Sequence, residues 1–185
     1  MPSHAIAPPL PAEARLRVFE EVKTLVVGQM EEAPASWRLV KSTEDTKAYL
    51  MKIIFRMEPK GLKELRMLQA MRHPFVLQIK EYFSDAAAWG AKANKAARLW
   101  IVLRPTAEAL SSVVEAKARS AHFPEPTLLN WLAQLVLAVD YFHSKAIVHQ
   151  RLSKIQSFFV SKSGTIHIGD LQDACVCDPG LFRFS

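Results

Sequence analysis

Cysteine is nearly absent from this sequence. Only Cys175 and Cys177 occur among its 185 residues. A Cys-x-Cys pair by itself lacks the four ligands of a zinc site. We therefore expect two free thiols in a reducing compartment.

Long hydrophobic runs are also missing. No apolar run approaches the roughly 20 residues that a membrane-spanning helix needs. Residues 1–11 contain four prolines and no hydrophobic region of a signal peptide. We expect residues 1–14 to form a disordered, proline-rich tail, and we expect a cytoplasmic protein without membrane contact.

The sequence contains no cluster of charged residues of one sign. The formal net charge is +6, from 24 Lys and Arg against 18 Asp and Glu, but the basic residues are scattered along the chain. They do not alternate regularly with aromatic residues, as a nucleic-acid platform would require. This pattern indicates a solvated basic surface and no nucleic-acid partner. With 50% hydrophobic residues the composition is that of a globular chain with one substantial core.

Glycine is scarce where a phosphate-binding loop would need it. Backbone amides approach phosphates closely only where glycines remove the obstructing Cβ atoms. After the β-like run Leu25–Val27, Gly28 is followed by Gln29–Pro34, a stretch that contains Glu31 and Glu32. These carboxylates would repel phosphate, so the sequence does not predict a phosphate-binding loop here.

Lys52 lies near the end of an otherwise apolar, β-like run, Ala48–Ile54. A buried lysine without a partner is costly, so an anionic neighbour is expected. The candidates are Glu64, Asp170 and a nucleotide phosphate. The pattern leaves open whether Glu64, 12 positions further on, pairs with Lys52 or is an exposed acid without a partner.

The second half of the chain shows apolar residues at helical spacing, followed by the pattern of a hairpin. The apolar residues of the long helical stretch suggest core packing; they are Leu128, Leu132, Leu135, Val136, Val139 and Phe142. Phe158–Val160 and Thr165–Ile168, joined around Ser163 and Gly164, predict a β-hairpin. Asp170 comes directly after its second strand.

These segments resemble, in order, those of a protein kinase. His149–Gln156 resembles the catalytic-loop pattern His-Arg-Asp-Leu-Lys-x-x-Asn, and Gly169–Gln172 resembles the segment that contains Asp-Phe-Gly. The resemblance runs from about Leu25 to about Ala174. The amino-acid sequence around Asn130 and Trp131 is most similar to that of the NIMA-related Ser/Thr kinases.

The reactive positions of that family are exchanged here. Arg151 stands where the family has the Asp that accepts the proton of the substrate hydroxyl, and a guanidinium cannot be deprotonated in a protein. The further exchanges are Ser153 for the Lys, Gln156 for the metal-binding Asn and Gln172 for the Gly of Asp-Phe-Gly. No residue remains for the role of general base.

The resemblance implies roles for several other residues. Those implied for nucleotide binding are Gly28, Lys52, Glu64, Leu103 as gatekeeper, and Arg104 and Thr106 with Pro105 as hinge. Asp170 and Gln156 would form a thin shell for Mg²⁺. The alternative is that Arg151 or Lys52 neutralises Asp170 in place of the metal.

The fold class expected from the resemblance is α+β and protein kinase-like. Residues 15–105 would form the small lobe, with five antiparallel strands and one helix, and residues 106–185 the first, mainly helical part of the large lobe. We expect a pseudokinase that acts through a protein partner covering the incomplete large lobe, with weak ATP and Mg²⁺ binding or none. The alternatives are an active Ser/Thr kinase and a fragment of a longer kinase.

Overall fold

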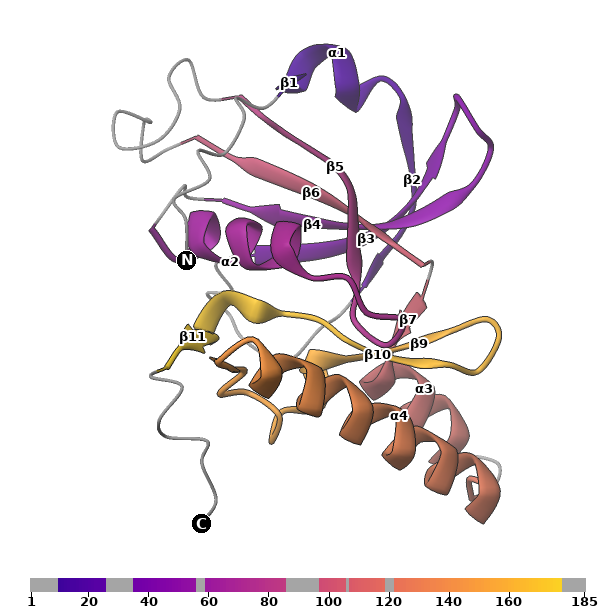
Figure 1. Cartoon of the computed structure of the whole chain (residues 1–185). Coiled ribbons are helices and arrows are strands. Elements are labelled where there is room, and N and C mark those ends of the chain that lie inside the picture. The colour runs from indigo at the N-terminus through magenta and orange to yellow at the C-terminus, as the bar shows by residue number, and fades with distance from the viewer. Residues whose placement is uncertain are drawn as a thin grey trace.

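The computed structural model describes residues 10–25, 35–55, 59–85, 97–105, 107–118 and 122–177. Its upper part is a sheet of six strands in the order β1-β5-β6-β4-β3-β2 (Figure 1). The strands are β1 Leu10–Pro11, β2 Phe19–Leu25, β3 Ala35–Ser42, β4 Ala48–Ile54, β5 Gln78–Ser84 and β6 Leu99–Arg104. Strands β2 to β6 pair antiparallel, as predicted, and the short β1 adds itself in parallel to the edge of β5.

The two faces of this sheet have separate cores because side chains alternate along a strand. On β4, Leu50, Lys52 and Ile54 point to the inner face, towards helix α2 (Pro59–Ala70), while Tyr49, Met51 and Ile53 point outward. The register of β2 against β3 shifts between Glu21 and Lys23. This bulge lets Phe19 join the outer core and Leu25 the inner one, although both have odd numbers.

The prediction of a disordered tail over residues 1–14 is wrong for residues 10–14, whereas residues 1–9 lie outside the described ranges. Residues 10–14 belong to β1 and to helix α1 (Ala12–Leu16), which covers the outer face of the sheet (Figure 1). Ala12 is buried in the outer core. The pairing of β1 with β5 and the burial of Ala12 stabilise this segment in an ordered conformation.

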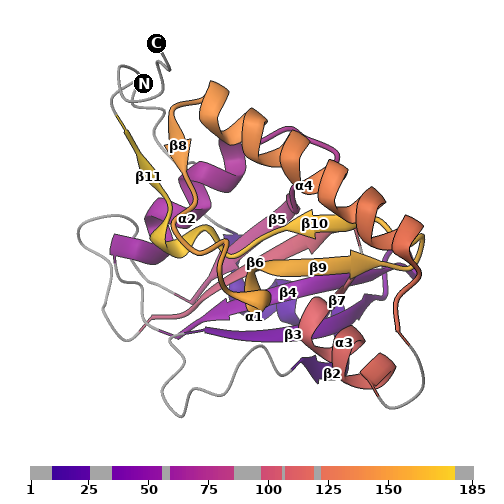
Figure 2. The ribbon, with the colours of Figure 1, turned by 90° about the horizontal axis from the view of Figure 1, so that it is seen from below.

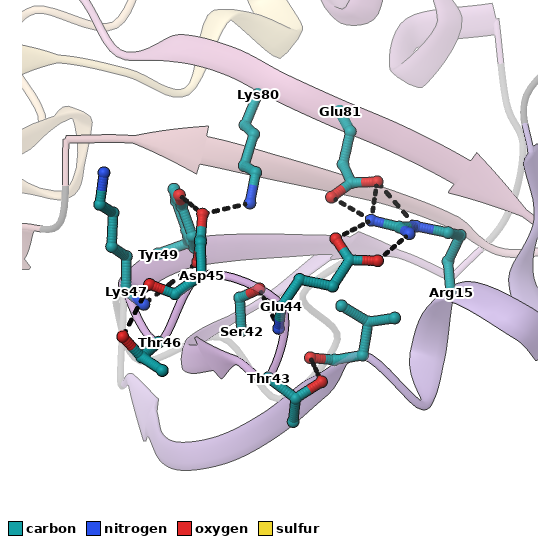
Figure 3. A network of polar contacts seen from close by, with 11 residues as sticks. Arg15, Ser42, Thr43, Glu44, Asp45, Thr46, Lys47, Tyr49, Lys80 and Glu81 are labelled. Atoms are coloured by element: carbon teal, nitrogen blue, oxygen red, sulfur yellow. Dashed lines mark hydrogen bonds and ion pairs between the residues drawn. The ribbon is translucent and has the colours of Figure 1, made fainter.

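An ion network fastens α1 to the sheet (Figure 3). The Arg15 guanidinium lies between two carboxylates, 2.8 Å from Glu44 and 2.7 Å from Glu81 of β5. Beside it, Lys80 Nζ lies 3.0 Å from Asp45 Oδ2 and 4.0 Å from the centre of the Tyr49 ring. The turn between β3 and β4 is thus tied to β5 and to α1.

The lower part holds the remaining α-helices and strands. They are β7 Ala107–Ala109, α3 Leu110–Ala118, α4 Glu125–Ser144, β8 Ile147–Val148, β9 Phe158–Ser161, β10 Ile166–Ile168 and β11 Cys175–Val176. The predicted hairpin is present as β9 and β10, with β7 on the other side of β9. None of the helices in the described ranges is long and apolar enough to cross a lipid bilayer.

Helix α4 lies along β10 (Figure 2), and only one stripe of its side chains is buried. Trp131, Ala138 and Phe142 are buried against the lower sheet and the β8 region, and Leu135 and Val139 are half-buried. The predicted core positions Leu128, Leu132 and Val136 are instead exposed, by 49%, 58% and 58%. Within the described part of the chain, no element packs over that side of the helix, so helical spacing alone overestimated the core.

A short backbone junction joins the two parts. Leu77 N–H donates to Ile168 O at 2.9 Å, and Ile168 N–H donates to Phe75 O at 2.8 Å. The inner core continues across this junction, from Leu50 and Leu65 above to Phe142 and Phe159 below. One apolar cluster therefore spans both parts of the domain.

Candidate active site

Lys52 occupies the centre of the site. Its side chain is 1% exposed, and Nζ lies 2.8 Å from both carboxylate oxygens of Glu64 and 2.7 Å from Asp170 Oδ1. The pairing of Lys52 with Glu64, which the sequence left open, is therefore present. Burial alone would lower the pKa of Lys52, but the charges of Glu64 and Asp170 outweigh it and raise that pKa above its usual value.

Helix α2 delivers Glu64 because its inner side faces the sheet. Leu65 and Leu68 are buried in the inner core, whereas Arg66 on the other side is exposed. Glu64 shares the buried side and also accepts a hydrogen bond from Leu171 N–H at 3.1 Å. The same carboxylate thus joins α2 to β4 and to the segment after Asp170.

Asp170 is held by two cations. Its Oδ1 contacts Lys52, and its Oδ2 lies 3.2 Å from Arg151 Nη1. Arg151 also lies 3.3 Å from Asp173 Oδ2. Asp170 has left-handed backbone angles, φ 58° and ψ 59°, which Asp tolerates better than most residues. Both neutralising partners that the sequence suggested for Asp170 are present together.

His149 braces the loop that carries Arg151. Arg151 N–H donates to His149 Nδ1 at 3.2 Å, so the ring proton lies on Nε2, which donates to Gly169 O at 2.9 Å. Burial lowers the pKa of His149, in agreement with a neutral ring. The contact fixes the loop against the segment that positions Asp170.

Ser157 is a site residue that sequence reasoning missed. It is fully buried, and its Oγ donates to Arg151 O at 3.0 Å, while Gly169 N–H donates to Ser157 O at 2.8 Å. Gln156, chosen from the motif spacing, is half-buried one residue earlier on the same 3₁₀ turn, Ile155–Ser157. The signal was present in the sequence: Ser157 directly precedes the apolar strand β9, where an inward polar residue must find a partner.

Comparisons of the sequence with known proteins identify its family. Residues 34–180 match the family model described as protein kinase domain. The chain belongs to the protein kinase family. It is similar to the serine/threonine-protein kinase Nek1 of Mus musculus, with 34% identity over 139 residues, which are 71% of this chain and 11% of the relative.

Two further relatives show the breadth of the similarity. The mouse serine/threonine-protein kinase Nek3 is 28% identical over 60% of this chain and 20% of its own length. The catalytic subunit of the cAMP-dependent protein kinase of Dictyostelium discoideum is 23% identical over 91% of this chain and 24% of its own. This kinase chain thus spans a quarter or less of the length of these curated relatives.

Protein kinases in general use ATP and Mg²⁺, but the residues of this kinase do not fit the metal. Mg²⁺ prefers several oxygen ligands with negative charge, whereas each oxygen of Asp170 already contacts a cation, Lys52 or Arg151. The guanidinium also adds a positive charge at that point. Among the described residues, no group of three or more His, Cys, Asp or Glu side chains is placed to hold a metal ion.

The other residues implied by the kinase resemblance lie apart from this network. Leu103 is buried on the inner face of β6, opposite Leu50 of β4. Arg104 is exposed at the end of β6 and borders, with Pro74 and Pro105, a shallow cavity of about 220 Å³. Gly28 and Thr106 lie outside the described residues.

Proposed function

We propose that this kinase domain is a pseudokinase, a protein-interaction or scaffold module with weak ATP binding or none. The observation that carries the proposal is the placement of Arg151, because a guanidinium cannot act as the base and, beside Asp170, it puts a positive charge where the metal would bind. A positioned acid or base contributes typically ~10² to 10⁴-fold in rate, and metal and oxyanion stabilisation contribute further factors. Losing both leaves too little catalysis for a working phosphotransferase.

One observation favours a second candidate, an active Ser/Thr kinase. The ion pair between Lys52 and Glu64 is formed, and in protein kinases this pair must be in place for phosphoryl transfer. An active enzyme would bind ATP in a metal-dependent way and transfer labelled phosphate to a protein hydroxyl. The two candidates therefore differ in measurable ways.

A thermal-shift titration with ATP, with and without Mg²⁺, separates them. We expect the wild-type melting temperature to change by less than the roughly 1–2 °C that about 0.5 kcal/mol of binding would give, and Mg²⁺ to make no difference. Asp170→Asn and Lys52→Ala serve as comparison variants. A large Mg²⁺-dependent stabilisation that both variants abolish, together with labelled phosphate on casein, would establish the enzyme instead.

The proposal includes a protein partner for the exposed side of α4. Five large apolar residues on this helix are about half exposed: Leu128, Leu129, Leu132, Val136 and Leu137. Contiguous apolar patches of this kind on a monomer usually mark an interface or an aggregation risk. We propose that a protein surface rich in apolar residues, and neither a membrane nor a nucleic acid, covers them.

Two glutamate substitutions on the exposed side of α4 test the proposal of a protein partner. In sedimentation at increasing concentration, the wild type should self-associate, and Leu132→Glu with Val136→Glu should remain monomeric. Their effect on the free energy of unfolding should be small, about 0.5 kcal/mol, because both side chains are already exposed. Glu125→Gln with Asp140→Asn on the same helix is the control that alters charge but leaves the patch intact. A wild type that stays monomeric at every concentration would argue against self-association through these residues.

A further inference from the structure

Trp37 of β3 fills the space between the two parts of the domain. Its side chain is 4% exposed, although the inner face of this sheet is where a kinase would receive its nucleotide. The indole packs on Phe159 of β9, a fully buried residue of the lower part. The two ring centres are 4.7 Å apart and the ring planes are inclined by 42°.

The same indole covers the amine of Lys52. Trp37 and Lys52 are direct neighbours in the register of β3 and β4, and Nζ lies 5.1 Å from the centre of the indole ring. A cation over an aromatic face at this distance is attracted to it, and more strongly where water is excluded. Nζ is thus enclosed by Trp37, Glu64 and Asp170, and it has no free direction for a phosphate.

The distance between the rings of Trp37 and Phe159 decides whether a nucleotide base can enter between them. Aromatic carbons in contact lie about 3.5 Å apart, so two surfaces that enclose a planar base must stand about 7 Å from each other. The 4.7 Å between Trp37 and Phe159 is the distance of direct contact. Leu50 and Leu103 are fully buried in the same apolar cluster and fill further space on the inner face of the sheet.

The nearby cavity does not replace this space. It measures about 330 Å³ and lies between β3, β7, α3 and the end of β9. Leu39, Val113 and Lys162 are among its lining residues, but neither Trp37 nor Lys52 is. Lys52 Nζ, which Trp37, Glu64 and Asp170 surround, does not border that cavity.

We infer that Trp37 is the residue that excludes nucleotide from this domain. It does so by filling the volume of a planar base and by covering the amine that would hold a phosphate. The inference rests on the proposed function and adds its physical cause: binding is lost through an occupied cleft, and not only through exchanged catalytic residues. Shortening this one side chain restores a site for a planar purine.

The experiment compares two buried tryptophans of the same sheet. Trp37→Ala opens the inner face, whereas Trp100→Ala removes an equally buried indole from the outer face, where Trp100 stacks on Phe83. Adenosine and ATP are titrated by calorimetry without Mg²⁺. We expect adenosine to bind Trp37→Ala at least tenfold more tightly than it binds wild type or Trp100→Ala.

Equal affinity for adenosine in Trp37→Ala and Trp100→Ala would overturn the inference. If Trp37→Ala does not fold, Trp37→Leu and Phe159→Leu open the same space from the upper and from the lower part. The same tenfold gain in affinity for adenosine is then required of these two variants. Phosphate transfer by the wild type would defeat the proposed pseudokinase role. A missing gain in the variants, with an inactive wild type, would defeat only the role of Trp37.

Discussion

Replacing Glu64 with leucine is expected to lower the free energy of unfolding by about 3–5 kcal/mol, because the change leaves a buried ammonium without its main partner. Lys52 and Glu64 are each 1% exposed, so water cannot take the place of the lost carboxylate. Asp170 would remain beside Lys52, but Arg151 already shares its charge. Urea unfolding followed by circular dichroism at pH 7 measures the effect.

The double variant Lys52→Met with Glu64→Leu is the matched control. Replacing both members of a buried ion pair with apolar residues of similar size is often close to neutral. We therefore expect the double variant to recover most of the stability that Glu64→Leu loses, with Asp170 still paired to Arg151. A loss below about 1 kcal/mol for Glu64→Leu alone would mean that the pair behaves like an exposed one, against the burial described here.

Replacing Phe159 with alanine is expected to cost about 3–5 kcal/mol, the range found when large aromatic side chains are removed from cores. Phe159 is fully buried and touches both parts of the domain, since it packs on Trp37 above and closely approaches Gly169 below. A Cβ atom on Gly169 would lie 2.9 Å from Phe159 Cε2, which shows how closely the floor of the cleft is packed. Thermal and urea unfolding measure the loss.

Phe158→Ala provides the control for that experiment. Phe158 neighbours Phe159 on β9, has the same size and faces the opposite side, where it is only half-buried. Its replacement should cost clearly less, about 1–2 kcal/mol, in proportion to the smaller apolar area removed from water. Equal losses for the two variants would contradict the special position of Phe159 between the lobes.

The sequence by itself determined the elements with strong local signals. The β9–β10 hairpin follows from two β-rich runs around Ser163 and Gly164, and Asp170 follows its second strand as the motif requires. The absence of a general base was also visible, because a guanidinium at position 151 cannot accept a proton in any fold. These conclusions depend on residue chemistry and on spacing along a short stretch of chain.

Packing over long sequence distances was decided only by the tertiary structure. Lys52 and Asp170 are 118 positions apart, and Trp37 meets Phe159 across the cleft between the two parts. Periodicity placed Leu132 in the core, yet it is exposed, because a helix has several apolar stripes and only its neighbours decide which one is buried. A sequence states which side chains need partners, but burial and charge can be satisfied in several ways, and only the folded arrangement selects one.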